Sequence, residues 1–172
     1  MLVTHIWWEF AFRWLHIISG VMWIGLLWYF NFVQTPSMPK IPDEQKPAIS
    51  KVIAPTALFW FRWGAMATII TGLILAGMSG YLLSAIKLGI GDHVGKNSAI
   101  GLGMWLGAIM WFNVWFIIWP NQKKALGIVN ATPDEKKVAA RTAGLTSRVN
   151  TMLSVPMLYC MASASHYFAI TG

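Results

Sequence analysis

Apolar residues dominate four long stretches of the chain, and polar residues gather between them. Each stretch exceeds the about 20 helical residues that cross the ~30 Å hydrocarbon core of a bilayer. The four stretches cover approximately residues 10–33, 56–83, 98–119 and 146–170. We therefore predict an all-α integral membrane protein, in which residues 1–172 form a single four-helix transmembrane bundle.

Composition supports this assignment. Of the 172 residues, 56% are hydrophobic and only 11% are charged, whereas soluble domains have about 25% charged residues. The single cysteine, Cys160, excludes an internal disulfide framework, a zinc site built on several thiolates and a C-x-x-C-H haem attachment. Any haem must therefore be held non-covalently.

The distribution of basic residues predicts the orientation in the membrane. The connections at 34–55 and 120–148 contain three and six Lys or Arg residues, and they lie on the same side of the predicted bundle. Short basic loops remain in the cytoplasm, so both termini are expected on the periplasmic side of a bacterial inner membrane. The first span lacks a basic n-region and should stay in the mature protein. Anionic lipids account for the net charge of +7, and no nucleic-acid partner is required.

Helix-capping signals mark the second basic connection. Thr132, Pro133 and Glu135 form a capping-box pattern, which predicts a short surface helix ending near Arg141. A similar Pro-Asp-Glu triplet in the first connection hints at two duplicated helical hairpins. Pro156 falls inside the fourth span and is expected to kink it.

Four titratable side chains fall inside the predicted spans, where a charge is costly and needs a partner or a function. They are Arg13, His16, Arg62 and His166. With a first helix starting near residue 10, His16 lies about 9 Å below the outer surface, and His166 lies about 6 Å below it on the antiparallel fourth helix. Two imidazoles at similar depth on facing helices are suited to ligating the iron of a b-type haem. We predict His16 and His166 as the metal ligands.

Small residues beside each histidine leave room for a porphyrin ring. Gly20 follows His16 by one helical turn, and Ala162 and Ser163 precede His166 by about one turn. Gly20 is therefore included among the predicted haem-binding residues.

Arg13 lies one turn nearer the outer surface, where haem propionates would point, and a guanidinium matches a carboxylate in charge and geometry. Its alternative is an ion pair with Glu9, four residues earlier. The alternative for His166 is a bond to a backbone carbonyl or contact with water. His5 and His93, outside the spans, are expected to be solvated or interfacial.

A second polar cluster is predicted in the inner half of the bundle. Arg62, Asn113 and Asn150 fall at similar depth, with Asn31 nearby. A cation surrounded by amides could bind an anionic or carbonyl-bearing small molecule such as a quinone or purine. The alternative is structural: Arg62 extends to the inner headgroups, and the amides join helices.

Three stretches of sequence resemble a known family. They are "RWLHIISGVMWIGLLWYFNF" at 13–32, "NVWFIIWPNQKK" at 113–124 and "SRVNTMLSVPMLYCMASASHYF" at 147–168. These stretches resemble the membrane domain of bacterial urate hydroxylase, also called the urate oxidase N-terminal family. The first stretch is also similar, more distantly, to membrane-bound protoporphyrinogen oxidase and copper resistance protein D.

The resemblance implies a redox role for Arg13, His16 and His166. Full-length members of the family have more helices and a C-terminal cytochrome c domain, and they are thought to oxidise urate. This chain resembles a short four-helix form without that domain, so its electrons should leave to a separate partner.

The combined prediction is a membrane-embedded haem b protein. It would pass electrons between a reduced donor, either quinol or a small substrate such as urate, and a periplasmic cytochrome or oxidase. Two alternatives remain open: a non-catalytic subunit of a larger respiratory or other electron-transfer complex, and a urate-oxidising enzyme. Met104 or another soft side chain could replace one histidine at the iron.

Overall fold

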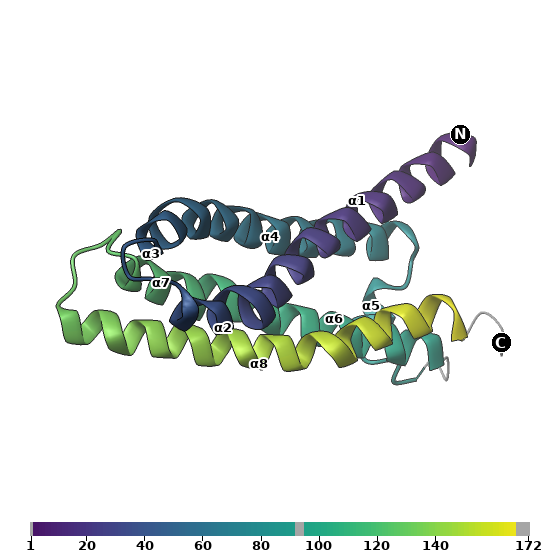
Figure 1. The fold of residues 1–172 in the computed structure, drawn as a ribbon. Coiled ribbons are helices and arrows are strands. Elements are labelled where there is room, and N and C mark those ends of the chain that lie inside the picture. The colour runs from purple at the N-terminus through teal and green to yellow at the C-terminus, as the bar shows by residue number, and fades with distance from the viewer. Residues whose placement is uncertain (1, 92–94, 168–172) are drawn as a thin grey trace.

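The computed structural model describes residues 2–91 and 95–167, which form helices joined by turns, so the predicted all-α class is confirmed for these ranges (Figure 1). Three of the elements are π-helical and η2 is a 3-10 helix. In chain order the elements are α1 (Leu2–Trp28), η1 (Tyr29–Gln34), α2 (Thr35–Ser37), η2 (Met38–Lys40), α3 (Lys46–Ala48), η3 (Ile49–Ile53), α4 (Ala54–Met78), α5 (Leu82–Ile86), α6 (Gly95–Phe112), η4 (Asn113–Ile118), α7 (Trp119–Ala125) and α8 (Pro133–Ser165).

Two helical hairpins pack against each other. The most extensive helix–helix contacts join α1 to α4 and α6 to α8. The N-terminal end of α1 projects from the bundle at the end where α8 finishes, and α7 and α3 lie at the opposite end (Figure 1). The chain thus pairs its helices in two hairpins, and their origin by duplication stays a prediction.

Three continuous helical runs are long and apolar enough to cross a membrane: Thr4–Lys40, Lys46–Met78 and Gly95–Ala125. The first run begins earlier than predicted, and the second ends at Met78 rather than near residue 83 because Gly80 adopts a positive φ of 75°. The fourth predicted span falls on α8, which has 33 residues but is more polar than the other three. Three to four helices are thus long and apolar enough to span a membrane, where four spans were predicted. Residues 168–170 of the fourth predicted span lie outside the described part.

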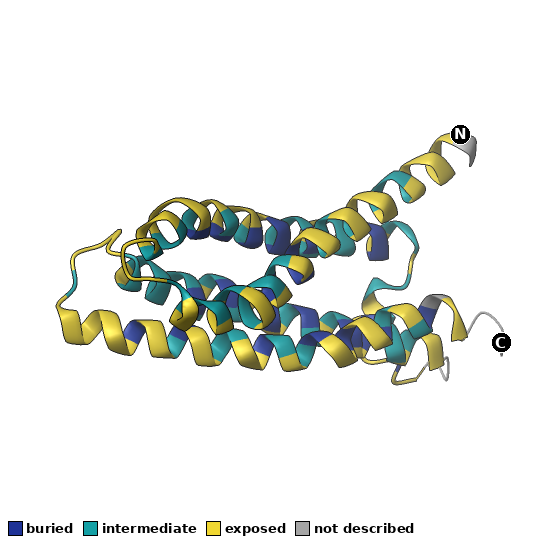
Figure 2. Ribbon diagram, viewed as in Figure 1, coloured by how far each residue is buried: buried dark blue, intermediate teal, exposed yellow. Residues whose placement is uncertain are grey.

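The hydrophobic core lies where the two hairpins meet. Its largest members are essentially inaccessible, and they come from α1, α4, α6 and η4: Trp23, Leu27, Phe61, Met110 and Val114. The outward-facing surfaces of the helices are mostly exposed (Figure 2), and many of the exposed side chains on them are large and apolar. An apolar exterior around a packed core is expected of a protein solvated by lipid.

Each π-helical segment ends two residues before a proline. The pairs are Gln34 and Pro36, Ile53 and Pro55, and Ile118 and Pro120. Proline donates no N–H, and its ring clashes with the carbonyl four residues earlier. A wider i→i+5 turn accommodates this clash, so each helix continues past its proline without a break.

The predicted capping box begins α8. The Glu135 N–H donates to the Thr132 hydroxyl over 3.3 Å, and the Thr132 N–H donates to Glu135 Oε2 over 2.7 Å. The predicted end near Arg141 is wrong, because the helix continues to Ser165 as a single element. Ala139 is buried, so this polar first part of the helix packs rather than ending as a separate surface turn. Pro156 lies inside this uninterrupted helix.

Candidate functional site

A largely apolar cavity of about 620 Å³ lies between α1, α4, α6 and α8. Cavities of roughly 300–1,000 Å³ are typical of cofactor and small-molecule sites. The lining residues that matter for its chemistry are an imidazole, three thioethers and several small residues: His16, Gly20, Gly72, Met104, Met157 and Met161. The cavity therefore combines little polar surface with several soft candidate metal ligands.

His16 is held by the backbone of α4. Its Nδ1 lies 2.9 Å from the carbonyl oxygen of Thr68, which can only accept a hydrogen bond, so Nδ1 carries the proton. Thr71 Oγ1 lies 3.4 Å from the same nitrogen. In the neutral ring, Nε2 then carries the free lone pair, and no described group bonds to it. Metal-binding histidines commonly have one nitrogen bonded to a carbonyl in this way, which leaves the other for the metal.

Gly72 makes room for this imidazole. A Cβ atom at position 72 would lie 2.8 Å from His16 Cε1 and 3.0 Å from Nδ1, which is too close for either atom to stay in place. Our sequence reasoning missed both Thr68 and Gly72. A glycine in mid-helix destabilises the helix by roughly 0.5–1 kcal/mol relative to alanine, and this feature could have directed attention to position 72.

Gly20 also lines the cavity, as the predicted space beside His16 requires. The second predicted ligand, His166, does not line the cavity. It is exposed at the C-cap of α8, where its backbone N–H donates to the carbonyl of Ala162 over 3.0 Å. The structure thus brings His16 and Gly20 together at the cavity. Shared ligation of one iron by both imidazoles stays a prediction.

Met104 from α6 and Met157 and Met161 from α8 are the soft side chains of the cavity. Met161 also packs against α6, since a Cβ on Gly103 would lie 3.3 Å from its sulfur. Thioethers are soft ligands and ligate haem iron opposite histidine in some cytochromes. They line the same cavity as His16, whereas His166 does not.

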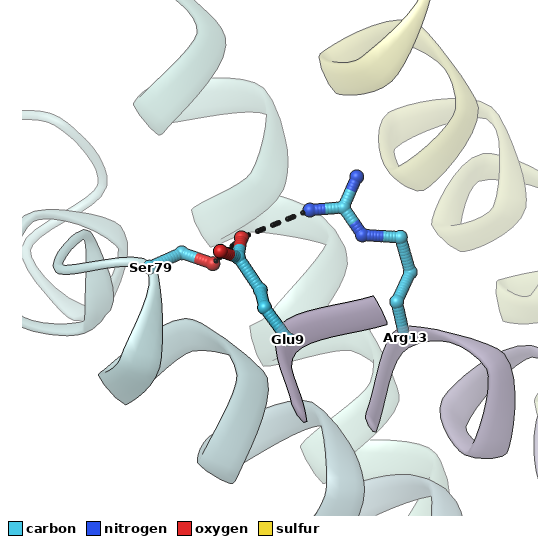
Figure 3. A network of polar contacts seen from close by, with 3 residues as sticks. All are labelled: Glu9, Arg13 and Ser79. Atoms are coloured by element: carbon cyan, nitrogen blue, oxygen red, sulfur yellow. Dashed lines mark hydrogen bonds and ion pairs between the residues drawn. The ribbon is translucent and has the colours of Figure 1, made fainter. Parts of the chain in front are cut away.

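Arg13 forms the ion pair that was its alternative role. Its Nη2 lies 3.2 Å from Glu9 Oε1, and Ser79 Oγ donates to the same carboxylate oxygen over 2.6 Å (Figure 3). Arg13 does not line the cavity, and its side chain is 56% exposed. The network fastens the N-terminal part of α1 to the turn after α4.

Arg62 and the asparagines form separate structures. The guanidinium carbon of Arg62 lies 3.4 Å from the centre of the Trp119 ring. Asn113 Nδ2 donates to Asn150 Oδ1 over 2.8 Å, and Asn150 Nδ2 donates to the Met110 carbonyl over 2.9 Å. In the described part of the chain, no hydrogen bond links Arg62 to either asparagine.

The amides therefore join helices. Asn150 is completely buried and fastens α8 to α6 and η4, while Asn31 Nδ2 donates to Ser147 Oγ over 2.8 Å and fastens η1 to α8. This arrangement corresponds to the structural alternative considered for the predicted substrate cluster.

The described residues contain no metal site built from clustered polar side chains. Within residues 2–91 and 95–167, no group of three or more His, Cys, Asp or Glu side chains could hold a metal ion. His93 lies outside the described residues. The apolar cavity is thus the candidate cofactor site that the described side chains offer.

The helices, the apolar exterior and the cavity define a multi-pass helical membrane protein with an interhelical cavity. Residues 92–172 match the family described as "Urate oxidase N-terminal". The predicted family resemblance is thereby confirmed over these residues, and the match is consistent with a membrane domain of that family. The match includes Asn113, Asn150 and His166 but not the α1–α4 hairpin that holds His16. No curated protein and no solved structure matches the chain.

Proposed function

We propose that the protein is a membrane-embedded haem b redox protein that passes electrons between a reduced donor and a periplasmic cytochrome or oxidase. Quinol and a small substrate such as urate are the candidate donors. The observation that carries the proposal is His16, whose Nδ1–H is bonded to Thr68 and whose Nε2 is free beside an apolar cavity. Four spans with both termini outside, in a bacterial inner membrane, complete the proposal.

The described residues fit a haem in size and chemistry. The cavity volume of about 620 Å³ lies within the range of cofactor sites. Gly25 and Gly107 also line it, and a Cβ at either position would meet nothing within 4 Å, so both leave space in the cavity. The apolar lining matches the porphyrin faces.

Under this proposal His16 would hold the iron through Nε2, with His166 as the second predicted ligand and a thioether of Met104 or Met161 as its alternative. A bound haem supplies one-electron exchange at its iron. A haem held by two protein ligands would be suited to electron transfer rather than to oxygen chemistry. Thr68 orients the imidazole, Gly72 admits it, and the apolar lining excludes water.

Arg13 keeps a supporting role in the proposal. Only one of its terminal nitrogens is bonded to Glu9, and its side chain is largely exposed on the outer part of α1, one turn from His16. The remaining guanidinium donors are available to a propionate.

A reduced-minus-oxidised absorption spectrum tests the proposal. Wild-type protein purified in mild detergent should show a b-type haem. His16→Ala should lose it, whereas His5→Ala, which removes an exposed histidine from the same helix, should retain it. Absence of pigment from wild-type protein expressed with sufficient haem, or retention of pigment by His16→Ala, contradicts the proposal.

The family match favours urate oxidation as a second candidate function. In that case urate added to membranes should reduce the pigment, and Arg62→Ala should abolish the response. A non-catalytic role in a larger complex would instead appear as stable co-purification with other subunits in mild detergent. A chain that migrates alone and is reduced by urate would be a free-standing enzyme.

A further inference from the structure

A second site is built where α4 meets η4 and α7, at the end of the bundle opposite the N-terminal end of α1 (Figure 1). Arg62 lies over Trp119 with its guanidinium carbon 3.4 Å from the ring centre, and 5.7 Å from the centre of Trp115. Lys123 Nζ lies 5.7 Å from the centre of the Trp119 ring. Two cations thus converge on one indole.

Neither cation has an acidic partner. In the described ranges the ion pairs are Glu9 with Arg13 and Asp43 with Lys46, and neither pair includes Arg62 or Lys123. Contact with an indole face stabilises a cation, but it leaves the charge without a counterion.

The same cluster contains two buried donors without acceptors. Arg62 Nε and Trp115 Nε1 are inaccessible to solvent and have no hydrogen-bond partner in the described structure. Trp23 Nε1 and Trp111 Nε1 are unpaired in the same way. At this cluster, however, the unpaired donors lie beside two cations without a counterion, and an oxyanion would both accept from the donors and neutralise the charge. We infer that this cluster binds the phosphate group of an anionic phospholipid.

The surroundings favour a lipid over a free anion. Trp63, whose ring lies 5.5 Å from that of Trp115, is half exposed, as are Phe59 and Phe116 on the same elements. These apolar side chains suit acyl chains, while the cations suit a headgroup. The connection after α7 is one of the two basic loops, which places the cluster on the cytoplasmic side of the proposed topology.

Native mass spectrometry of the full chain from nanodiscs tests this inference. The probes are phosphatidylglycerol and phosphatidylcholine with identical acyl chains. Wild-type protein should retain phosphatidylglycerol preferentially. Arg62→Gln should weaken retention about tenfold, and Trp115→Phe, which removes the indole N–H donor together with part of the ring, about fivefold.

Arg141→Gln, an exposed basic residue of α8, is the matched control and should leave retention unchanged. If Arg62→Gln does not fold, Trp115→Phe alone carries the test. Equal retention of the two lipids, or wild-type retention by Trp115→Phe, overturns the inference. So does displacement of the lipid by inorganic phosphate or urate, which would identify a small-anion site. The pigment spectrum of wild-type protein reports on the haem proposal independently of all these outcomes.

Discussion

At the residue scale, the position of the His16 ring depends on two small features of α4. The Thr68 carbonyl fixes the tautomer, and the absence of a side chain at Gly72 admits the ring. Sequence reasoning identified His16 because a titratable group inside an apolar span requires a partner. It could not identify Thr68, because the partner is a backbone atom with no pattern in the sequence, and it missed Gly72, for which a glycine in mid-helix was the available signal.

Gly72→Ala tests this arrangement. The new Cβ would lie 2.8 Å from His16 Cε1, so the imidazole must move and its bond to Thr68 is lost. We expect the free energy of unfolding to fall by about 1–3 kcal/mol and the haem to be lost or its spectrum altered. Gly77→Ala in the same helix is the control, since a Cβ there meets nothing within 4 Å. Equal thermal stability and pigment in both variants would disprove the account of Gly72.

Asn150 gives a second residue-scale prediction. Asn150→Ala removes bonds to Asn113 and Met110 from a fully buried position, and we expect a loss of about 1–2 kcal/mol in thermal unfolding in detergent. Asn130→Ala, in an exposed loop, should be neutral. If Asn150→Ala leaves stability unchanged but raises the KM for urate, the residue belongs to a substrate site instead.

At the element scale, the sequence predicts the existence of the helices better than their ends. Long apolar stretches located the four long helices, and the capping box located the start of the last of them, α8. The predicted helix end near Arg141 was wrong, because α8 continues through this position to Ser165. Ala139 is buried, and its packing stabilises the polar first turns of the helix. The π segments were also not predicted, although Pro36, Pro55 and Pro120 mark them, because prolines in a sequence more often signal a helix end than a widened turn.

The capping box of α8 predicts a dependence on pH. Hydrogen bonds from the backbone and hydroxyl of Thr132 lower the pKa of Glu135. A lowered pKa stabilises the fold fully above the carboxyl's ordinary value of about 4.3, and this stabilisation is lost as pH falls through the lower folded value. Glu135→Gln should therefore flatten the loss of stability between neutral and acidic pH, measured by thermal unfolding.

Thr132→Ala should reduce stability by about 1 kcal/mol at neutral pH. Thr56→Ala is a useful comparison, because the Thr56 hydroxyl bonds only to a carbonyl within its own helix. If wild type and Glu135→Gln lose equal thermal stability on acidification, the Glu135 carboxylate does not stabilise the start of α8.

At the scale of the whole molecule, two hairpins enclose the cavity, and each contributes different groups. The α1–α4 hairpin supplies the imidazole and its anchors, while α6 and α8 supply the thioethers. The sequence predicted the bundle and its orientation from hydropathy and charge. It paired His16 with His166 by depth alone, and depth along a helix does not specify which face a side chain occupies.

The proposed orientation predicts labelling by a membrane-impermeant maleimide. Asn130→Cys, in the loop before α8, should react only after cells are permeabilised, whereas Thr4→Cys, near the start of α1, should react in intact spheroplasts. The native Cys160 is buried and provides the background signal in wild-type protein. Reaction of Asn130→Cys in intact spheroplasts would reverse the orientation.

The proposed bond between His16 Nε2 and haem iron can be measured through the haem content of His16→Gly. Wild-type protein should purify with about one b-type haem per chain. His16→Gly should be devoid of haem and should regain it when imidazole and haem are added, because imidazole can occupy the space left by the side chain. Full haem content in His16→Gly without imidazole would contradict the account.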